Sequence, residues 1–197
     1  MKKVFLIALA LISCFAAEAQ LRTIKPSYIY KISDGDLDNI IDGFCLGTWS
    51  NANNIVASSA LKAQGSKSYK ASNVFDRDPE TAWVEGVKGH GIGQWIELKN
   101  TSIRETGIWC GVYQICILNG YVKSDKAWRE NGRVKRLKVY CNGKPKYIME
   151  LQNSRSLQAF DVDFSKGATI RFEILDVYPG TKYQDTVITE IAFDACY

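Results

Sequence analysis

Histidine is almost absent from this chain, since His90 is the only one in 197 residues. A Ser-His-Asp or Cys-His catalytic site needs a histidine base, and a Cys/His metal site needs more than one histidine among unclustered cysteines. No serine lies in a G-x-S-x-G elbow, and "GHGIG" lacks the lysine and the glycine spacing of a phosphate loop. A two-carboxylate glycosidase stays open because a sequence does not show how far apart carboxylates lie. We nevertheless expect no enzymatic activity.

Charge of one sign and long apolar runs are scarce as well. The net charge is +4, and removing two lysines and one glutamate with residues 1–19 leaves +3. That balance is too mild to indicate a nucleic-acid partner, and the only dense basic stretch is "KSDKAWRENGRVKRLK". The longest apolar run, Val4 to Ala17, is shorter than the ~20 residues that a membrane-spanning helix needs. The chain therefore predicts no transmembrane segment, and nothing in it specifies an oligomeric state.

Residues 1–19 have the pattern of a secretory signal peptide. Two lysines precede the apolar run, and Ala17-Glu18-Ala19 ends it with small residues before Gln20. A second reading cuts before Cys14 in "LISC", which would give a lipid-anchored protein, but the apolar residues after Cys14 are unusual for a tether. We favour cleavage after Ala19 and expect an exported protein that is secreted, periplasmic or at the cell surface.

The cysteine count is odd once the signal peptide is removed. Six cysteines less Cys14 leave five, so at least one cannot pair within the chain. Because an exported chain permits disulfides, we expect one or two of them and a buried thiol, with the pairing unspecified. The five are Cys45, Cys110, Cys116, Cys141 and Cys196.

Strand signals are dense after residue 55 and helical periodicity is rare. The clearest is an alternation over 137–141 followed by Asn142-Gly143, the strongest short-range hairpin signal. Further short strands are expected at 94–98, 106–118, 159–164, 168–178 and 186–193. This pattern predicts an all-β sandwich or barrel over 55–197, with 20–54 as an N-terminal extension packed on it.

Oxygen ligands crowd into "DRDPET". Asp76, Asp78 and Thr81 lie within six residues, and Pro79 restricts the turn between them. A tight irregular loop with carboxylates and carbonyls suits calcium. An Asx-turn with a threonine cap explains the same residues, so both interpretations stay open.

Four motifs in order carry a family resemblance over Ile55 to Phe193. "ASNVFDRDPETAW" resembles the A-x-N-x-x-D-G-D-x-x-T-x-W signature of discoidin-like, galactose-binding-like domains, and "TVITEIAF" resembles their final strand. "TAWVEGVKGHGIGQWIEL", "LNGYVKSDKAWRENGRVKRLKVY" and "YPGTKYQDTVITEIAF" resemble the glycan-binding domain found with streptococcal NAD-glycohydrolase toxins. The resemblance implies an antiparallel jelly-roll β-sandwich with binding loops at one end.

The resemblance also implies a structural calcium ion that joins the first loop to the last strand. Its implied ligands are the side chains of Asp76, Thr81 and Glu190, and the carbonyls of Asn73, Asp78 and Thr189. Arg77 departs from the glycine that the family commonly has. It either tolerates the turn or replaces the ion by pairing with Asp76.

The candidate ligand-binding residues follow from the same resemblance. We expect Trp128, in a polar loop, to be an exposed ring on which a sugar stacks, and Trp83 and Trp95 to be core or sheet residues. The other candidates are Tyr121, Lys123, Arg133, Glu85, His90, Tyr183 and Asp185. Lys123 and Arg133 also fit ordinary solvated charges, and Glu85 and Asp185 also fit partners of those cations. The expected function is a non-catalytic carbohydrate-binding module for a glycan or glycoconjugate; the alternative is a protein-interaction domain of the same fold.

Overall fold

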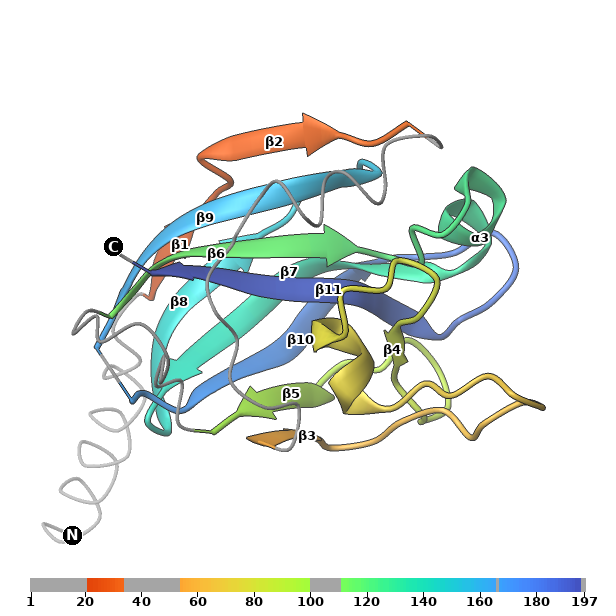
Figure 1. The fold of residues 1–197 in the computed structure, drawn as a ribbon, viewed down its shortest axis with the longest axis horizontal. Coiled ribbons are helices and arrows are strands. Elements are labelled where there is room, and N and C mark those ends of the chain that lie inside the picture. The colour runs from red at the N-terminus through yellow and green to blue at the C-terminus, as the bar shows by residue number, and fades with distance from the viewer. Residues whose placement is uncertain (1–20, 34–53, 100–110, 166, 196–197) are drawn as a thin grey trace, which may run out of the picture.

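The computed structural model describes residues 21–33, 54–99, 111–165 and 167–195, which are mostly β-strands (Figure 1). The strands are β1 (Arg22–Ile24), β2 (Tyr28–Lys31), β3 (Ile55–Ala57), β4 (Trp83–Val84), β5 (Trp95–Leu98), β6 (Val112–Asn119), β7 (Gly132–Cys141), β8 (Lys144–Glu150), β9 (Ser156–Phe164), β10 (Ile170–Tyr178) and β11 (Thr186–Ala195). The helices in this part of the chain are the 3-10 helix η2 (Ala71–Phe75) and the α-helix α3 (Asp125–Glu130).

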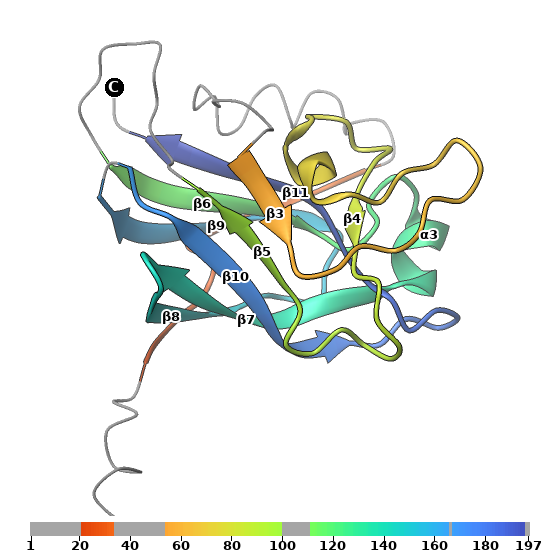
Figure 2. The same cartoon turned by 90° about the horizontal axis from the view of Figure 1, so that it is seen from below.

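The strands form two layers that face each other (Figures 1 and 2). One layer has the order β2-β9-β6-β11, and the other has β7-β10-β5-β3, with β8 beside β7 and β1 beside β8. The pairings between these named strands are antiparallel except β1 with β8 and a short contact of β11 with β7, which joins the layers at Thr186 and Gly132. The predicted all-β, antiparallel jelly-roll sandwich is confirmed.

The main hydrophobic core lies between the layers. Residues that alternate along each strand place one side of the strand in this core, as the period of two requires. Leu137 and Val139 of β7 are fully buried, as are Phe160 of β9 and Phe172 of β10. Trp83 is also fully buried, which confirms its expected place in the core.

The hairpin at Asn142-Gly143 forms where the sequence predicts it. Asn142 has φ 50° and Gly143 has φ 77°, and they join β7 to β8. Two successive positive φ angles are what a type I′ turn requires, and Asn and Gly are the residues that adopt them most readily. The Asn142 side chain also accepts a hydrogen bond from the Thr169 amide at 2.8 Å, which fastens the turn to the start of β10.

The described part of the N-terminal extension joins the sheet edges. β2 pairs with β9, and β1 pairs with β8. No helix in the described residues is long and apolar enough to span a membrane. The signal peptide and three of the five cysteines (Cys45, Cys110 and Cys196) lie outside these residues, so export and the disulfides stay predictions. Cys141, one of the two described cysteines, is a free thiol.

Candidate functional site

A pocket opens at the end of the sandwich where three connecting segments meet. They are the segment between β3 and η2, the segment from β6 through α3 to β7, and the segment between β10 and β11, all at the right-hand end of Figure 1. The cavity volume is about 270 Å³. Its lining residues are Leu61, Gln64, Lys67, Tyr69, Val84, Tyr121, Lys123, Ala127, Glu130, Asn131, Tyr183 and Asp185.

The floor of the pocket is a small hydrophobic cluster separate from the main core. Tyr69, Val84 and Tyr121 are buried in it, and Leu61 and Ala127 pack against them. The rim is polar, with amides from Gln64 and Asn131 and four charged side chains among the lining residues. An apolar floor with a few polar groups around it is the usual composition of a small-molecule site.

Four of the eight predicted binding residues line this pocket together: Tyr121, Lys123, Tyr183 and Asp185. The ammonium group of Lys123 lies over the Tyr121 ring, 4.2 Å from its centre. Tyr183 is 41% exposed, so it is the aromatic ring most open to solvent among the pocket residues. Four of the twelve lining residues were therefore among the sequence-based candidates, and the other four candidates do not line the pocket.

The expectation that Trp128 is an exposed ring in a loop is wrong. It lies on α3, which begins after Ser124, whose hydroxyl accepts a hydrogen bond from the Ala127 amide. The indole is half-buried: it packs against a cluster that includes Val122, and its N–H donates to the Asn119 carbonyl at 2.9 Å. The Arg133 guanidinium lies 4.5 Å from the ring centre. These contacts leave the indole little freedom to serve as a stacking platform.

Arg133 is a structural residue rather than a solvated charge. It is 7% exposed, and burial lowers its pKa from the ordinary value. Its guanidinium donates to the Asn153 side chain and to the carbonyls of Trp128, Asn131 and Pro179. One buried cation thus fastens the end of α3 to the segment that leads into β11, and both form walls of the pocket.

Glu85 and His90 fasten the same wall from the other side. The Glu85 carboxylate is fully buried and accepts hydrogen bonds from the amides of Val87 (2.9 Å) and Thr186 (3.2 Å). Burial raises the pKa of Glu85, and these two amides oppose the rise. His90 Nδ1 lies 3.1 Å from the Gln184 carbonyl, and the His90 carbonyl accepts from the Thr186 hydroxyl. Neither side chain lines the pocket.

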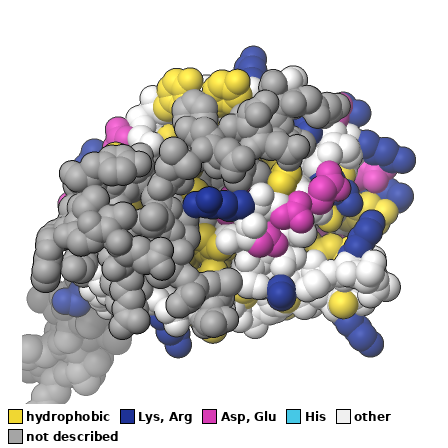
Figure 3. All heavy atoms as spheres, in the orientation of Figure 1, with side chains coloured by type: hydrophobic (Ala, Val, Ile, Leu, Met, Phe, Trp, Pro, Cys, Tyr) yellow, Lys and Arg dark blue, Asp and Glu magenta, His cyan; other side chains and the backbone are white. Residues whose placement is uncertain are grey.

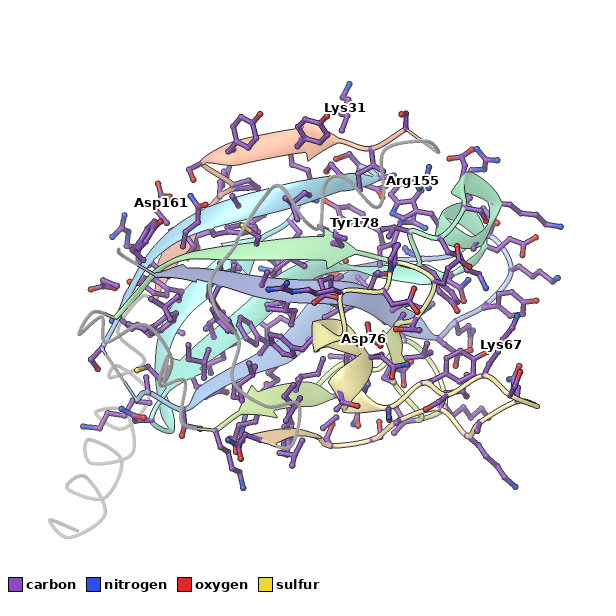
Figure 4. All side chains as sticks on the ribbon, viewed as in Figure 1. Lys31, Lys67, Asp76, Arg155, Asp161 and Tyr178 are labelled. Carbon is purple, nitrogen blue, oxygen red and sulfur yellow. The ribbon has the colours of Figure 1, made fainter. Side chains whose placement is uncertain are left out.

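The predicted calcium loop lies between η2 and β4, near the pocket. Figure 4 labels Asp76 beside η2, and Figure 3 shows acidic side chains in a row on this face. Asp76 accepts from the Asp78 amide at 3.1 Å and from the Thr81 hydroxyl at 2.7 Å, and Asp78 accepts from the Glu80 amide. These contacts are the Asx-turns and threonine cap that the sequence offered as one interpretation.

The Asx-turns do not explain why the Glu190 carboxylate is buried with an oxygen that has no partner in the described residues. Glu190 is 6% exposed, and its Oε2 atom has no hydrogen-bond partner in the described residues. Burial raises the pKa of Glu190 to about 9; the charges of Asp76 and Asp78 add to that rise, whereas the backbone amide and charge of Arg77 oppose it. A buried carboxylate beside two others is a place where a bound cation would remove an electrostatic cost.

Arg77 and Asn73 are the other two residues of the predicted calcium site whose conformation or contacts bear on an ion. Arg77 adopts φ 59°, the left-handed region that favours glycine, and its guanidinium forms no ion pair with the carboxylates of the described residues. It therefore tolerates the turn and does not form the ion pair with Asp76 through which it would replace an ion. The Asn73 side-chain amide donates to the carbonyls of Ser68 and Ala82, which closes the loop.

The predicted calcium loop, residues 76–82, is called the acidic loop below, and hydrogen bonds connect it to the pocket. The Tyr121 hydroxyl donates to the Glu80 carbonyl at 3.1 Å, so the pocket floor is attached to the acidic loop. The Thr189 hydroxyl donates to the Gly120 carbonyl at 2.7 Å and accepts from the Val122 amide at 3.1 Å. The strand that carries Glu190 thereby positions the segment that carries Tyr121.

Sequence analysis missed several pocket residues. Tyr69 and Lys67 come from the segment between β3 and η2, and Figure 4 labels Lys67 at the far end of the molecule. Glu130 and Asn131 end the short helix α3. The only available signal was the polar character of these segments, which is common to most surface loops.

Comparison with known proteins agrees with this architecture. The family model of the NAD glycohydrolase translocation F5/8 type C domain matches residues 47–194. A solved structure of the CBM32-1, CBM32-2 and M60 catalytic domains of ZmpB from Clostridium perfringens is similar, with a TM-score of 0.54 and 13% identity over 94% of this chain. The chain spans 18% of the length of that structure. A structure of CBM32-1 and CBM32-2 from the same protein in complex with GalNAc is also similar, with a TM-score of 0.53 and 11% identity over 92% of this chain. The chain spans 42% of the length of that second structure.

A third similar structure is a CBM32 domain that the match covers almost completely. It is CpGH89CBM32-5 from Clostridium perfringens in complex with GalNAc-beta-1,3-galactose, with a TM-score of 0.50 and 16% identity over 73% of this chain and 96% of that one. At such identities the likeness shows the fold alone. No curated protein matches the chain. The family match covers most of the sequence, and the chain therefore belongs to the NAD glycohydrolase translocation F5/8 type C domain family.

Proposed function

We propose that this domain binds a carbohydrate in the pocket lined by Tyr121, Lys123, Tyr183 and Asp185. The observation that carries the proposal is the composition of the pocket, with aromatic rings beside hydrogen-bonding groups at the loop end of a jelly roll. A sugar presents a face of C–H groups, which packs on an aromatic ring, and hydroxyls at its edge, which need fixed donors and acceptors. Tyr183 supplies the exposed ring, and Gln64, Asn131 and Asp185 supply polar groups.

The comparisons support a binding role of this kind. Two similar structures are CBM32 domains in complex with GalNAc or with GalNAc-beta-1,3-galactose. The family is described as a translocation domain of NAD glycohydrolases, which accords with a domain that binds rather than catalyses. The engagement of His90 with the Gln184 carbonyl is likewise a structural contact, so our proposal is a non-catalytic module. Export of this module rests on the signal-peptide pattern of residues 1–19.

Calcium is proposed as a structural ion at the acidic loop. In the described residues no three Asp, Glu, His or Cys side chains gather closely enough to hold a metal by themselves. Calcium, however, takes many of its oxygens from carbonyls and hydroxyls. Asp76, Thr81 and Glu190 would supply side-chain oxygens, with carbonyls from Asn73, Asp78 and Thr189. The partnerless Glu190 Oε2 atom is the observation that favours the ion. When bound, the ion would neutralise carboxylates that repel one another.

The proposed function is tested with a glycan array followed by titration of the glycans that bind. Replacing the exposed ring in Tyr183→Ala should lower the affinity roughly tenfold, because one aromatic contact contributes about 1–1.5 kcal/mol. Tyr113→Ala is the matched control: Tyr113 is 40% exposed and lies near the start of β6, whereas the pocket lies beyond the end of that strand. An array without any bound glycan would instead favour the protein-interaction alternative.

A further inference from the structure

The charges around the pocket are unevenly paired. Four charged side chains line it: Lys67, Lys123, Glu130 and Asp185. Glu130 has a cation of its own, because Lys126, one helical turn earlier on α3, places Nζ 4.0 Å from its carboxylate. The remaining three are two lysines and one aspartate, so the pocket has an excess of positive charge.

Neither lysine is neutralised by the protein in the part of the chain that the structure describes. No carboxylate of those residues lies within ion-pair distance of the Lys67 or the Lys123 ammonium group. The Tyr121 ring fixes the position of the Lys123 ammonium group 4.2 Å from its centre, but a ring carries no net charge to cancel it. Lys123 is therefore held in place with its charge available.

Lys67 acts on the same part of the pocket. Burial raises the pKa of the Tyr121 hydroxyl. The charge of Lys67 opposes this rise, whereas the charges of Glu80 and Asp78, which do not line the pocket, add to it. Both lysines are thus close enough to Tyr121 for their fields to combine at the pocket floor. Positive side chains around a concave surface concentrate their field there and attract an anion.

Asp185 offsets only part of this field, because it is one negative charge against two lysines. The described residues show no ion pair between Asp185 and either lysine, and its charge acts on the buried Glu85 on the neighbouring wall. A carboxylate in a sugar site accepts hydrogen bonds from hydroxyls. The pocket therefore offers an acceptor for hydroxyl groups and two cations for a negative group.

We propose that the ligand of this pocket is an acidic sugar, with a carboxylate or a sulfate that Lys67 and Lys123 bind and hydroxyls that Asp185 binds. The inference rests on the proposed carbohydrate-binding function and specifies its ligand class. A neutral sugar would leave both ammonium groups without an anionic partner, whereas an acidic one supplies a negative group that accepts charge-assisted hydrogen bonds from them.

The experiment compares three sugars that share one ring and differ in charge: galactose, galacturonic acid and sulfated galactose, each displayed on the same polymer. Wild-type protein should bind the two charged sugars roughly tenfold more tightly than galactose, and added salt should narrow the difference. Lys67→Met and Lys123→Met should each weaken binding of the charged sugars about fivefold while leaving galactose binding unchanged. The two charged probes also tell a carboxylate ligand from a sulfate ligand.

Lys62→Met is the matched control, because Lys62 is exposed on the same segment as Lys67 but does not line the pocket. This substitution should change neither the affinity for the charged sugars nor the affinity for galactose. If galactose binds as tightly as the charged sugars, or the glycans bound on the array are neutral and survive both lysine substitutions, the acidic-sugar inference is overturned and the proposed function stands. If no glycan binds at all, both fail together.

Discussion

The pocket walls lie at the same end of the sandwich as the acidic loop, but the two regions differ in whether their buried charged groups have hydrogen-bond partners. Behind the walls, the Arg133 guanidinium donates to four acceptors and the Glu85 carboxylate accepts from two amides. Beside the acidic loop, the buried Glu190 keeps an oxygen without any partner among the described residues. The chain completes the first region by itself, whereas the second needs a proton or a cation.

Because of this difference, Arg133 and Glu85 fix the geometry of the pocket walls, whereas Glu190 makes the stability of the neighbouring loop depend on the solution. A buried charge whose hydrogen bonds are all made within the protein fixes local geometry, and removing it leaves its partners unsatisfied. A buried carboxylate without partners makes stability depend on the solution, through pH or metal ions. The connection from Tyr121 to Glu80 means that the two regions can be tested against each other.

The largest effect is expected from Arg133→Met. The substitution removes a buried cation and leaves an amide oxygen and three carbonyls without their donor, so the free energy of unfolding should fall by roughly 3 kcal/mol. Urea denaturation measures the change. Arg136→Met is the control: Arg136 is exposed and pairs only at the surface with Asp176, which predicts a loss of at most about 1 kcal/mol. Equal losses in the two variants would show that the Arg133 contacts do not hold the walls.

The second effect concerns the acidic loop and its proposed ion. Calcium at about 100 times its Kd should raise the free energy of unfolding by roughly 2.7 kcal/mol over the chelated protein. That gain corresponds to about 5–10 °C in Tm for a domain of this size. Glu190→Gln should remove most of the response, because the amide keeps the shape of the side chain without its charge. An unchanged Tm on chelation, with no calcium found by elemental analysis, would eliminate the ion.

The third effect is the pH dependence of the metal-free protein. The pKa of Glu190 is raised from 4.5 to about 9, so the folded protein holds a proton that the unfolded chain releases. The stability that this proton provides is fully present below about pH 4.5 and is lost as the pH rises to about 9. The slope is at most about 1.4 kcal/mol per pH unit. Denaturation of chelated protein at several pH values measures it, and Glu190→Gln should flatten the curve. A slope that survives the substitution would have another origin.

Sequence reasoning succeeded where local rules decide the structure and failed where distant segments do. The Asn142-Gly143 hairpin was predictable because both residues favour the positive φ angles that the turn requires. Trp128 was misplaced because a helix as short as α3 shows no clear periodicity, and because the partner of its ring, Arg133, belongs to the next strand. Lys67 could not be assigned to the pocket, since only the folded layers bring its segment next to Tyr121.

The same limit applies to the acidic loop. Asp76 and Thr81 were recognised from a local motif, and the hydrogen bond from the Thr81 hydroxyl to the Asp76 carboxylate follows from that spacing. The burial of Glu190 was not predictable from its own strand, because it arises only when η2 and the acidic loop pack against β11. Residues 186–191 of β11 are all buried, and nothing in the sequence of the strand shows that the carboxylate among them lacks a partner.

The smallest effect is expected from Tyr121→Phe, which removes the hydrogen bond between the two regions and keeps the ring. The loss should be about 1 kcal/mol in the free energy of unfolding, the usual contribution of one hydrogen bond. Tyr183→Phe is the control, because the partner of its hydroxyl in the described residues is the exposed Lys182, and a contact between exposed groups should change the free energy of unfolding far less. Because Thr189 still attaches the Tyr121 segment to β11, Tyr121→Phe should leave the calcium response of Tm intact. A variant that loses the calcium response together with the hydrogen bond would show that Glu80 and Tyr121 hold the acidic loop in its ion-binding shape, and would make the two regions a single unit.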